Sequence, residues 1–113
     1  MRLNQIVVDC PDPSRLVRFW AGLLGGEPVL RAHGWAHVVP PGWPRLSFQP
    51  VPEPKAVKNR LHLDIDVPDI AAATRRATGL GATALGGVHT DEQGSFQVLR
   101  DPAGNEFCFV TPR

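Results

Sequence analysis

The chain has 113 residues, which fits one domain with a modest hydrophobic core. Its net charge of +1, apolar content of 42% and charged content of 20% are ordinary for a globular protein, and no run of lysine or arginine favours nucleic-acid or membrane-surface binding. Because no apolar stretch approaches the roughly 20 residues that span a bilayer and the N-terminus shows no signal-peptide pattern, we expect a cytoplasmic protein with no nucleic-acid or membrane partner.

The first half of the chain predicts a strand, a helix and three short strands. Residues 3–10 alternate in polarity, as a strand with one more polar face does. Asp12-Pro13 is a helix-start signal, apolar residues follow at helical spacing, and Gly25-Gly26 ends the helix. Residues 27–49 are broken by glycine and proline into three short strands.

The second half predicts the same order of elements with clearer signals. Its opening strand has leucine, isoleucine and valine on one side, Leu61 included, and histidine and aspartate on the other. The expected elements are a strand at 60–67, a helix opened by Pro68-Asp69 and ending near 80, strands near 82–88 and 95–100, a turn at 101–105 and a last strand at 106–110.

The two halves are related by an internal repeat. The stretch that begins at Gln5 recurs, remodelled, at His62, and the same offset pairs Gly22-Leu23 with Gly79-Leu80. We therefore expect an α+β fold of two βαβββ modules, about 1–52 and about 60–113, joined by a linker at 53–59. Two such modules facing each other would form a cleft. By strand parity, the cleft face carries Gln5, Ser47, Gln49, His62, Glu106 and Cys108.

This pattern resembles the vicinal oxygen chelate superfamily, the group of glyoxalases, bleomycin-resistance proteins and dioxygenases. The resemblance rests on the paired βαβββ pattern, on residues 60–67 and most specifically on the closing motif at 101–107. Residues 48–55, continuing to 59–60, further resemble the glyoxalase-like subgroup common in actinobacterial genomes. The resemblance implies the glyoxalase/bleomycin resistance/dihydroxybiphenyl dioxygenase fold, with a curved mixed-sheet cleft, and a homodimer.

The resemblance also implies a metal site of altered composition. Family enzymes hold a divalent metal with residues from the first and last strand of each module. The matching positions here are Gln5, His62 and Cys108, with Gln49 or Ser47 as the fourth, a choice that the alignment leaves open. Since the family's two glutamates are missing, the set suits zinc through Cys and His, or no metal at all.

Two functions follow from this altered site. One is the binding of a small oxygenated metabolite, with metal-dependent lyase, isomerase or dioxygenase chemistry if the protein is an enzyme, though not that of a standard glyoxalase I. Glu106 is then the candidate base. The alternative is a non-catalytic drug-binding protein of the bleomycin-resistance kind.

Several residues have a structural interpretation beside the functional one. Trp35, Trp43 and Phe96, with Ser47, are candidates to line the ligand cavity, and core or dimer packing explains the aromatic residues equally well. Asp64 and Asp66 could form a pair of acids, but because Asp9 matches Asp66 across the repeat, strand ends and helix entry suit them better. The sequence does not name the ligand, nor say whether the cleft closes within one chain or across two.

Overall fold

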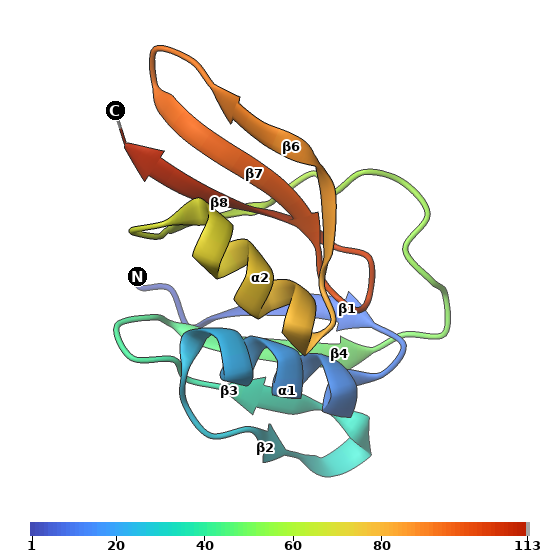
Figure 1. The fold of residues 1–113 in the computed structure, drawn as a ribbon. Helices are drawn as coiled ribbons and strands as arrows, with labels where there is room; N and C mark the ends of the chain where they lie inside the picture. Colours follow the sequence, from blue (N-terminus) through green and yellow to red (C-terminus); the bar gives the residue numbers. More distant parts are fainter. Residues whose placement is uncertain (113) are drawn as a thin grey trace. The chain divides into compact units, whose positions relative to one another are not determined.

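Two copies of one βαβββ unit make up the computed structural model, which describes residues 1–112 (Figure 1). The first unit spans Met1–Lys55 and the second begins at Ala56. Each unit has its own mixed sheet and its own α-helix. The α+β fold predicted from the repeat is confirmed. In residues 1–112, no helix is long and apolar enough to cross a membrane.

The first module has the sheet order β1-β4-β3-β2. Its opening strand β1 runs parallel to its closing strand β4, and the other neighbours are antiparallel. The elements are β1 (Gln5–Cys10), α1 (Pro13–Leu24), β2 (Val29–Leu30), a short 3₁₀ turn (Ala32–Gly34), β3 (Ala36–Val38) and β4 (Arg45–Pro50).

The second module repeats this topology with the order β5-β8-β7-β6, and β5 is again parallel to the closing strand β8. One expectation was wrong. The opening strand starts at Leu63, so Leu61 does not reach the core and is 74% exposed. The elements are β5 (Leu63–Asp66), α2 (Ile70–Leu80), β6 (Thr83–Thr90), β7 (Gly94–Arg100) and β8 (Glu106–Pro112).

Both helices begin at equivalent aspartates of the repeat. The Asp12 carboxylate accepts from the Arg15 N–H at 3.2 Å, and the Asp69 carboxylate accepts from the Ala72 N–H at 3.1 Å. Each bond satisfies a backbone donor that has no partner inside the helix. The predicted helix starts are thus confirmed, and the caps fix where each helix leaves its opening strand.

Each helix covers one face of its own sheet. In the first module α1 packs on β3 and β4 and buries Leu16, Phe19 and Trp20. In the second, α2 packs on β6, β7 and β8. Because side chains alternate along a strand, the buried Leu99, Phe107 and Phe109 of β7 and β8 leave the residues between them on the other face.

The closing motif forms a buried turn between β7 and β8. Asp101 is 4% exposed, and its Oδ1 accepts from the backbone N–H groups of Ala103 at 2.9 Å and Asn105 at 3.0 Å. Gly104 takes a φ of +89°, a conformation that glycine adopts without strain. This turn sets the register in which β8 returns along β7, and so places the residues of β8.

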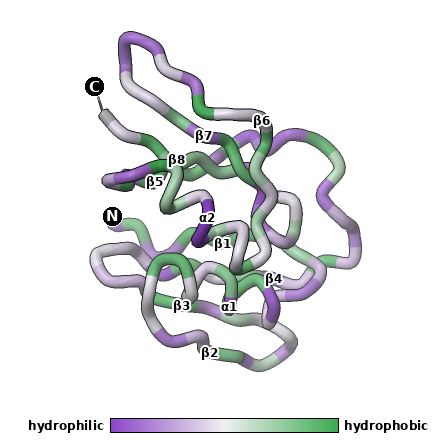
Figure 2. The backbone as a smooth tube through the Cα atoms, viewed as in Figure 1, coloured by the Kyte–Doolittle hydropathy of each residue, from purple (hydrophilic) through white to green (hydrophobic). Residues whose placement is uncertain are grey.

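We predict that Asp101→Ala lowers the free energy of unfolding by about 2–4 kcal/mol, because it leaves two partly buried backbone donors without an acceptor. Asp91→Ala is the matched control. Asp91 Oδ1 also accepts from two backbone N–H groups, those of Gln93 and Gly94, on the hydrophilic β6–β7 turn (Figure 2), where Asp91 and Gln93 are exposed and Gly94 is buried. Solvent can replace the exposed bond to Gln93, so we expect a smaller loss of about 1 kcal/mol. Urea unfolding measures both, and equal losses would contradict the role given to the closing turn.

Candidate functional site

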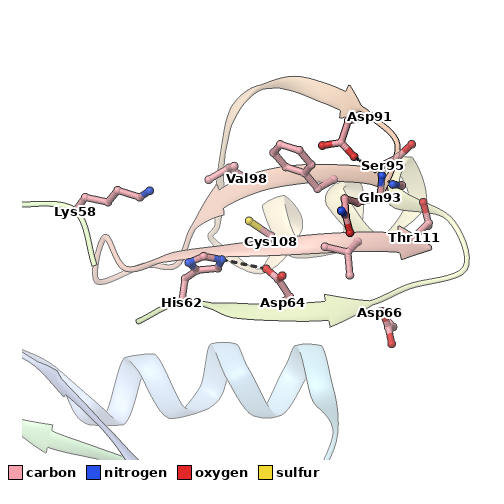
Figure 3. A pocket seen from close by; sticks show the side chains of 13 residues that line it. Lys58, His62, Asp64, Asp66, Asp91, Gln93, Ser95, Val98, Cys108 and Thr111 are labelled. Atoms are coloured by element: carbon pink, nitrogen blue, oxygen red, sulfur yellow. Dashed lines mark hydrogen bonds and ion pairs between the residues drawn. The ribbon is translucent and has the colours of Figure 1, made fainter. Parts of the chain in front are cut away.

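The second module contains a pocket of about 480 Å³ on the sheet face that does not carry α2 (Figure 3). Its walls come from β5, β7 and β8, from the segment before β5 and from the β6–β7 turn. The polar part of the lining includes His62, Asp64 and Cys108, which lie together. The apolar part of the lining is supplied by Phe96, Val98 and Val110.

Strand register brings these residues together. Asp64 lies opposite Cys108, which lies opposite Val98 on its other side. Two residues further along each strand, on the same face, comes a second row. That row consists of Asp66, Val110 and Phe96.

His62, Asp64 and Cys108 form a compact cluster of three potential metal ligands. Their ligand atoms all lie within 4.8 Å of one another, and His62 Nε2 is 3.2 Å from Asp64 Oδ1 (dashed in Figure 3). The side chains of His62 and Asp64 are 46% and 56% exposed, whereas Cys108 is buried. The cluster is thus accessible to a ligand from the side of the imidazole and the carboxylate.

The Cys108 thiol is held in its protonated form. Burial raises its pKa, and the neighbouring Asp64 raises it further through its charge and through a hydrogen bond to the thiol, while Lys58 acts weakly in the opposite direction. Since the thiolate is the nucleophile and the metal ligand, Cys108 is a poor nucleophile at neutral pH.

The first module has its own version of this row. The repeat makes Val7 the counterpart of Asp64, and Val7 lies opposite Ser47 just as Asp64 lies opposite Cys108. Ser47, rather than Gln49, is therefore the counterpart of Cys108. The Ser47 hydroxyl also donates to Gln5 Oε1 at 2.6 Å. The structure thus brings Gln5 and Ser47 together, whereas Gln49 pairs with Asp9 further along the strands.

Glu106 is engaged elsewhere in the second module. Its carboxylate accepts from the Asn59 N–H at 3.2 Å, and its carbonyl oxygen accepts from Asn59 Nδ2 at 3.1 Å. It is only 8% exposed, and it is not among the described residues that line the pocket. Glu106 therefore anchors the segment that carries His62 into β5.

The aromatic candidates separate between the two modules. Phe96 lines the pocket and stacks on His89 with 5.3 Å between ring centroids. Trp35 belongs to the first module, where the Arg31 guanidinium lies over its ring at 5.8 Å. Trp43 belongs to the first module as well, and its backbone N–H donates to the Pro40 carbonyl oxygen across a turn.

Asp64 is the site residue that the sequence interpretation missed. It had been assigned to a strand end, although the strict alternation of residues 62–66 already placed it on the same side as His62. That alternation was the available signal.

A profile described as a glyoxalase-like domain matches residues 5–110. The chain belongs to the glyoxalase-like domain family. The resemblance to the vicinal oxygen chelate superfamily is thereby confirmed. No curated protein matches the chain closely enough to count as a relative.

Solved structures of other proteins share the fold of this glyoxalase-like chain over nearly its whole length. A glyoxalase/bleomycin resistance protein/dioxygenase family enzyme from Burkholderia phytofirmans superposes with a TM-score of 0.81 at 16% identity, over 97% of this chain and 98% of the other. A superfamily member from Sphaerobacter thermophilus gives 0.74 at 19% identity, over 98% and 97%. TnmS3, an antibiotic binding protein from a Streptomyces species, gives 0.74 at 21% identity, over 100% and 97%.

We predict that Asp64→Asn lowers the pKa of Cys108 in the glyoxalase-like chain, because the substitution removes a negative charge beside the thiol. At a fixed pH below that pKa, more thiolate is present and alkylation by iodoacetamide becomes faster. Mass spectrometry of the Cys108 peptide across pH measures this, with the buried Cys10 as an internal reference. Asp66→Asn, two residues along the same strand, should leave the profile unchanged. An unshifted or upward-shifted profile for Asp64→Asn would contradict the electrostatic assignment.

Proposed function

We propose that this protein binds a small molecule with a flat apolar body and a polar, oxygen-bearing end in the pocket of the second module. The observation that carries the proposal is the mixed lining of the pocket, in which the cluster of His62, Asp64 and Cys108 lies beside the apolar side chains of Val98, Phe96 and Val110. Its volume of about 480 Å³ falls within the roughly 300–1,000 Å³ of typical ligand sites.

The charges of the lining indicate which ligands the pocket favours. Asp64, Asp66 and Asp91 line it together with a single cationic side chain, Lys58, among the described residues. Such a lining repels anions, so we expect a neutral or cationic ligand whose hydroxyl or carbonyl group meets His62. The fold that this chain shares with an antibiotic binding protein supports a binding role.

Binding takes precedence over catalysis in this proposal because of Glu106. The sequence offered this residue as the base, but its carboxylate accepts a hydrogen bond from Asn59 instead of facing the pocket. Burial and, after it, the neighbouring Asp64 raise the pKa of the Cys108 thiol, so the thiol stays protonated. Neither group is prepared to attack or to deprotonate a ligand.

A metal-dependent lyase, isomerase or dioxygenase is the second candidate, and the cluster of His62, Asp64 and Cys108 is the observation in its favour. Imidazole nitrogen, carboxylate oxygen and thiolate sulfur are all zinc ligands, and three protein ligands leave a position for substrate. Bound zinc would supply Lewis-acid polarisation of a carbonyl oxygen. The residues fit zinc, provided that Cys108 gives up its proton on binding.

Screening a library of flat oxygenated and heteroaromatic fragments by ¹H–¹⁵N correlation spectra tests the binding proposal. Ligands should shift the amide signals of Phe96, Val98 and Cys108. Val98→Trp fills the pocket beside Cys108 and should abolish these shifts, whereas Val88→Trp, at a position on β6 that is 53% exposed, should preserve them. Ligands that bind elsewhere, or that bind Val98→Trp as well as the wild type, would refute the proposal.

Zinc titration of protein purified without a histidine tag tests the second candidate. We expect one zinc per chain, bound about tenfold or more weakly by His62→Ala and by Asp64→Asn. Gln5→Ala is the control, because Gln5 belongs to the metal set predicted from the sequence but not to this cluster. A wild-type chain without zinc affinity, or an equal loss in Gln5→Ala, would reject this three-residue site.

A further inference from the structure

The first module carries two buried hydrogen-bonding atoms that have no partner. They are His37 Nδ1 and Arg45 Nε, and neither contacts a hydrogen-bonding atom within the described part of the chain. A buried polar atom without a partner costs free energy, so such atoms in a folded protein call for an explanation. Two of them near each other point to a missing ligand group.

Register places both atoms in one patch. His37 lies opposite Ser47, and Arg45 lies opposite Gln5 and two residues from Ser47 on β4. Directly opposite residues have Cβ atoms about 5 Å apart. Leu46, between Arg45 and Ser47, is buried on the α1 side of the sheet. His37, Arg45, Gln5 and Ser47 therefore share the face that α1 leaves open, and we call them the Arg45 patch.

The Arg45 patch offers mainly donors. Arginine has no acceptor, and the carbonyl oxygen of Gln5 already accepts from the Ser47 hydroxyl. This bond leaves the Gln5 amide nitrogen as the group that can reach a ligand. His37 can present its Nδ1 as an N–H donor in one of its neutral tautomers. The complement of such a patch is a group that only accepts hydrogen bonds, such as a carboxylate or a carbonyl oxygen.

The charge of the patch suits a single negative charge. Burial lowers the pKa of His37, and the positive charges of Arg45 and Arg31 lower it further, so the imidazole is neutral at pH 7. Arg31 is exposed and stacks on Trp35. On β1 the acid that shares this face is Asp9, which lies opposite Gln49 and two residues beyond Val7 and Ser47. The positive charge of Arg45 is therefore the one that a bound anion would neutralise.

We propose that the first module binds a carboxylate group in the Arg45 patch, with one oxygen on the Arg45 guanidinium and the other within reach of His37. A guanidinium donates short, charge-assisted hydrogen bonds to a carboxylate oxygen, which leaves the second oxygen for the His37 N–H. A phosphate dianion would leave one charge unbalanced, and a metal cation would be repelled by Arg45. The proposal concerns the first module and does not rest on the ligand pocket of the second.

The test uses benzoate as the probe and benzamide as its neutral match. Resonances of arginine Nε–H groups in the full chain are followed by ¹H–¹⁵N spectra at constant ionic strength. We expect benzoate to shift the Arg45 Nε–H signal and benzamide at the same concentration to leave it in place. Arg45→Met should weaken benzoate binding, followed through the backbone amide of His37, by about tenfold or more, since a charge-assisted hydrogen bond is lost.

Two further variants keep the test independent of folding. Arg45→Lys keeps the charge and the aliphatic stem but removes the planar fork, so benzoate binding should be weakened though not abolished. Arg18→Met, at an exposed position of α1 in the same module, should bind benzoate as the wild type does. Equal shifts by benzoate and benzamide, full binding by Arg45→Met, or inorganic phosphate binding more tightly than benzoate would overturn the proposal.

Discussion

The parallel pairing of the opening and closing strand in each module is the constraint on which both proposed sites depend. It places Asp64 against Cys108 in the second module and Val7 against Ser47 in the first. Since side chains alternate between the faces of a sheet, a slip of one residue would turn every one of these groups toward the helix. The buried Asp101 turn fixes the register of β8 against β7, which places Cys108 opposite Val98.

One topology carries two different chemistries. In the second module the row around Cys108 offers acceptors and soft ligands, with the carboxylate of Asp64 beside the imidazole of His62. In the first module the corresponding row holds Val7 and Ser47, and the row two residues before it places Arg45 opposite Gln5, whose carbonyl oxygen already accepts from Ser47. A cation suits the former and an anion suits the latter.

Local signals predicted the fold, and long-range pairing decided the sites. Asp12 and Asp69 cap their helices through atoms three residues away, so the sequence suffices to locate them. The choice between Ser47 and Gln49 depends on the register of β4 against β1, which are joined through a helix and two other strands. Local alternation already places Asp64 on the side of His62, but its position beside Cys108 depends on the register of β5 against β8. The strand predicted from residue 60 begins only at Leu63, and just before it Asn59 is held by Glu106, which is distant in sequence.

Interstrand nuclear Overhauser effects between the opening and closing strands measure this register most directly. We predict contacts that place Asp64 opposite Cys108 and Val7 opposite Ser47. Contacts that place Asp64 opposite Val110, or Val7 opposite Gln49, would contradict it, because the two rows would then contain other residues.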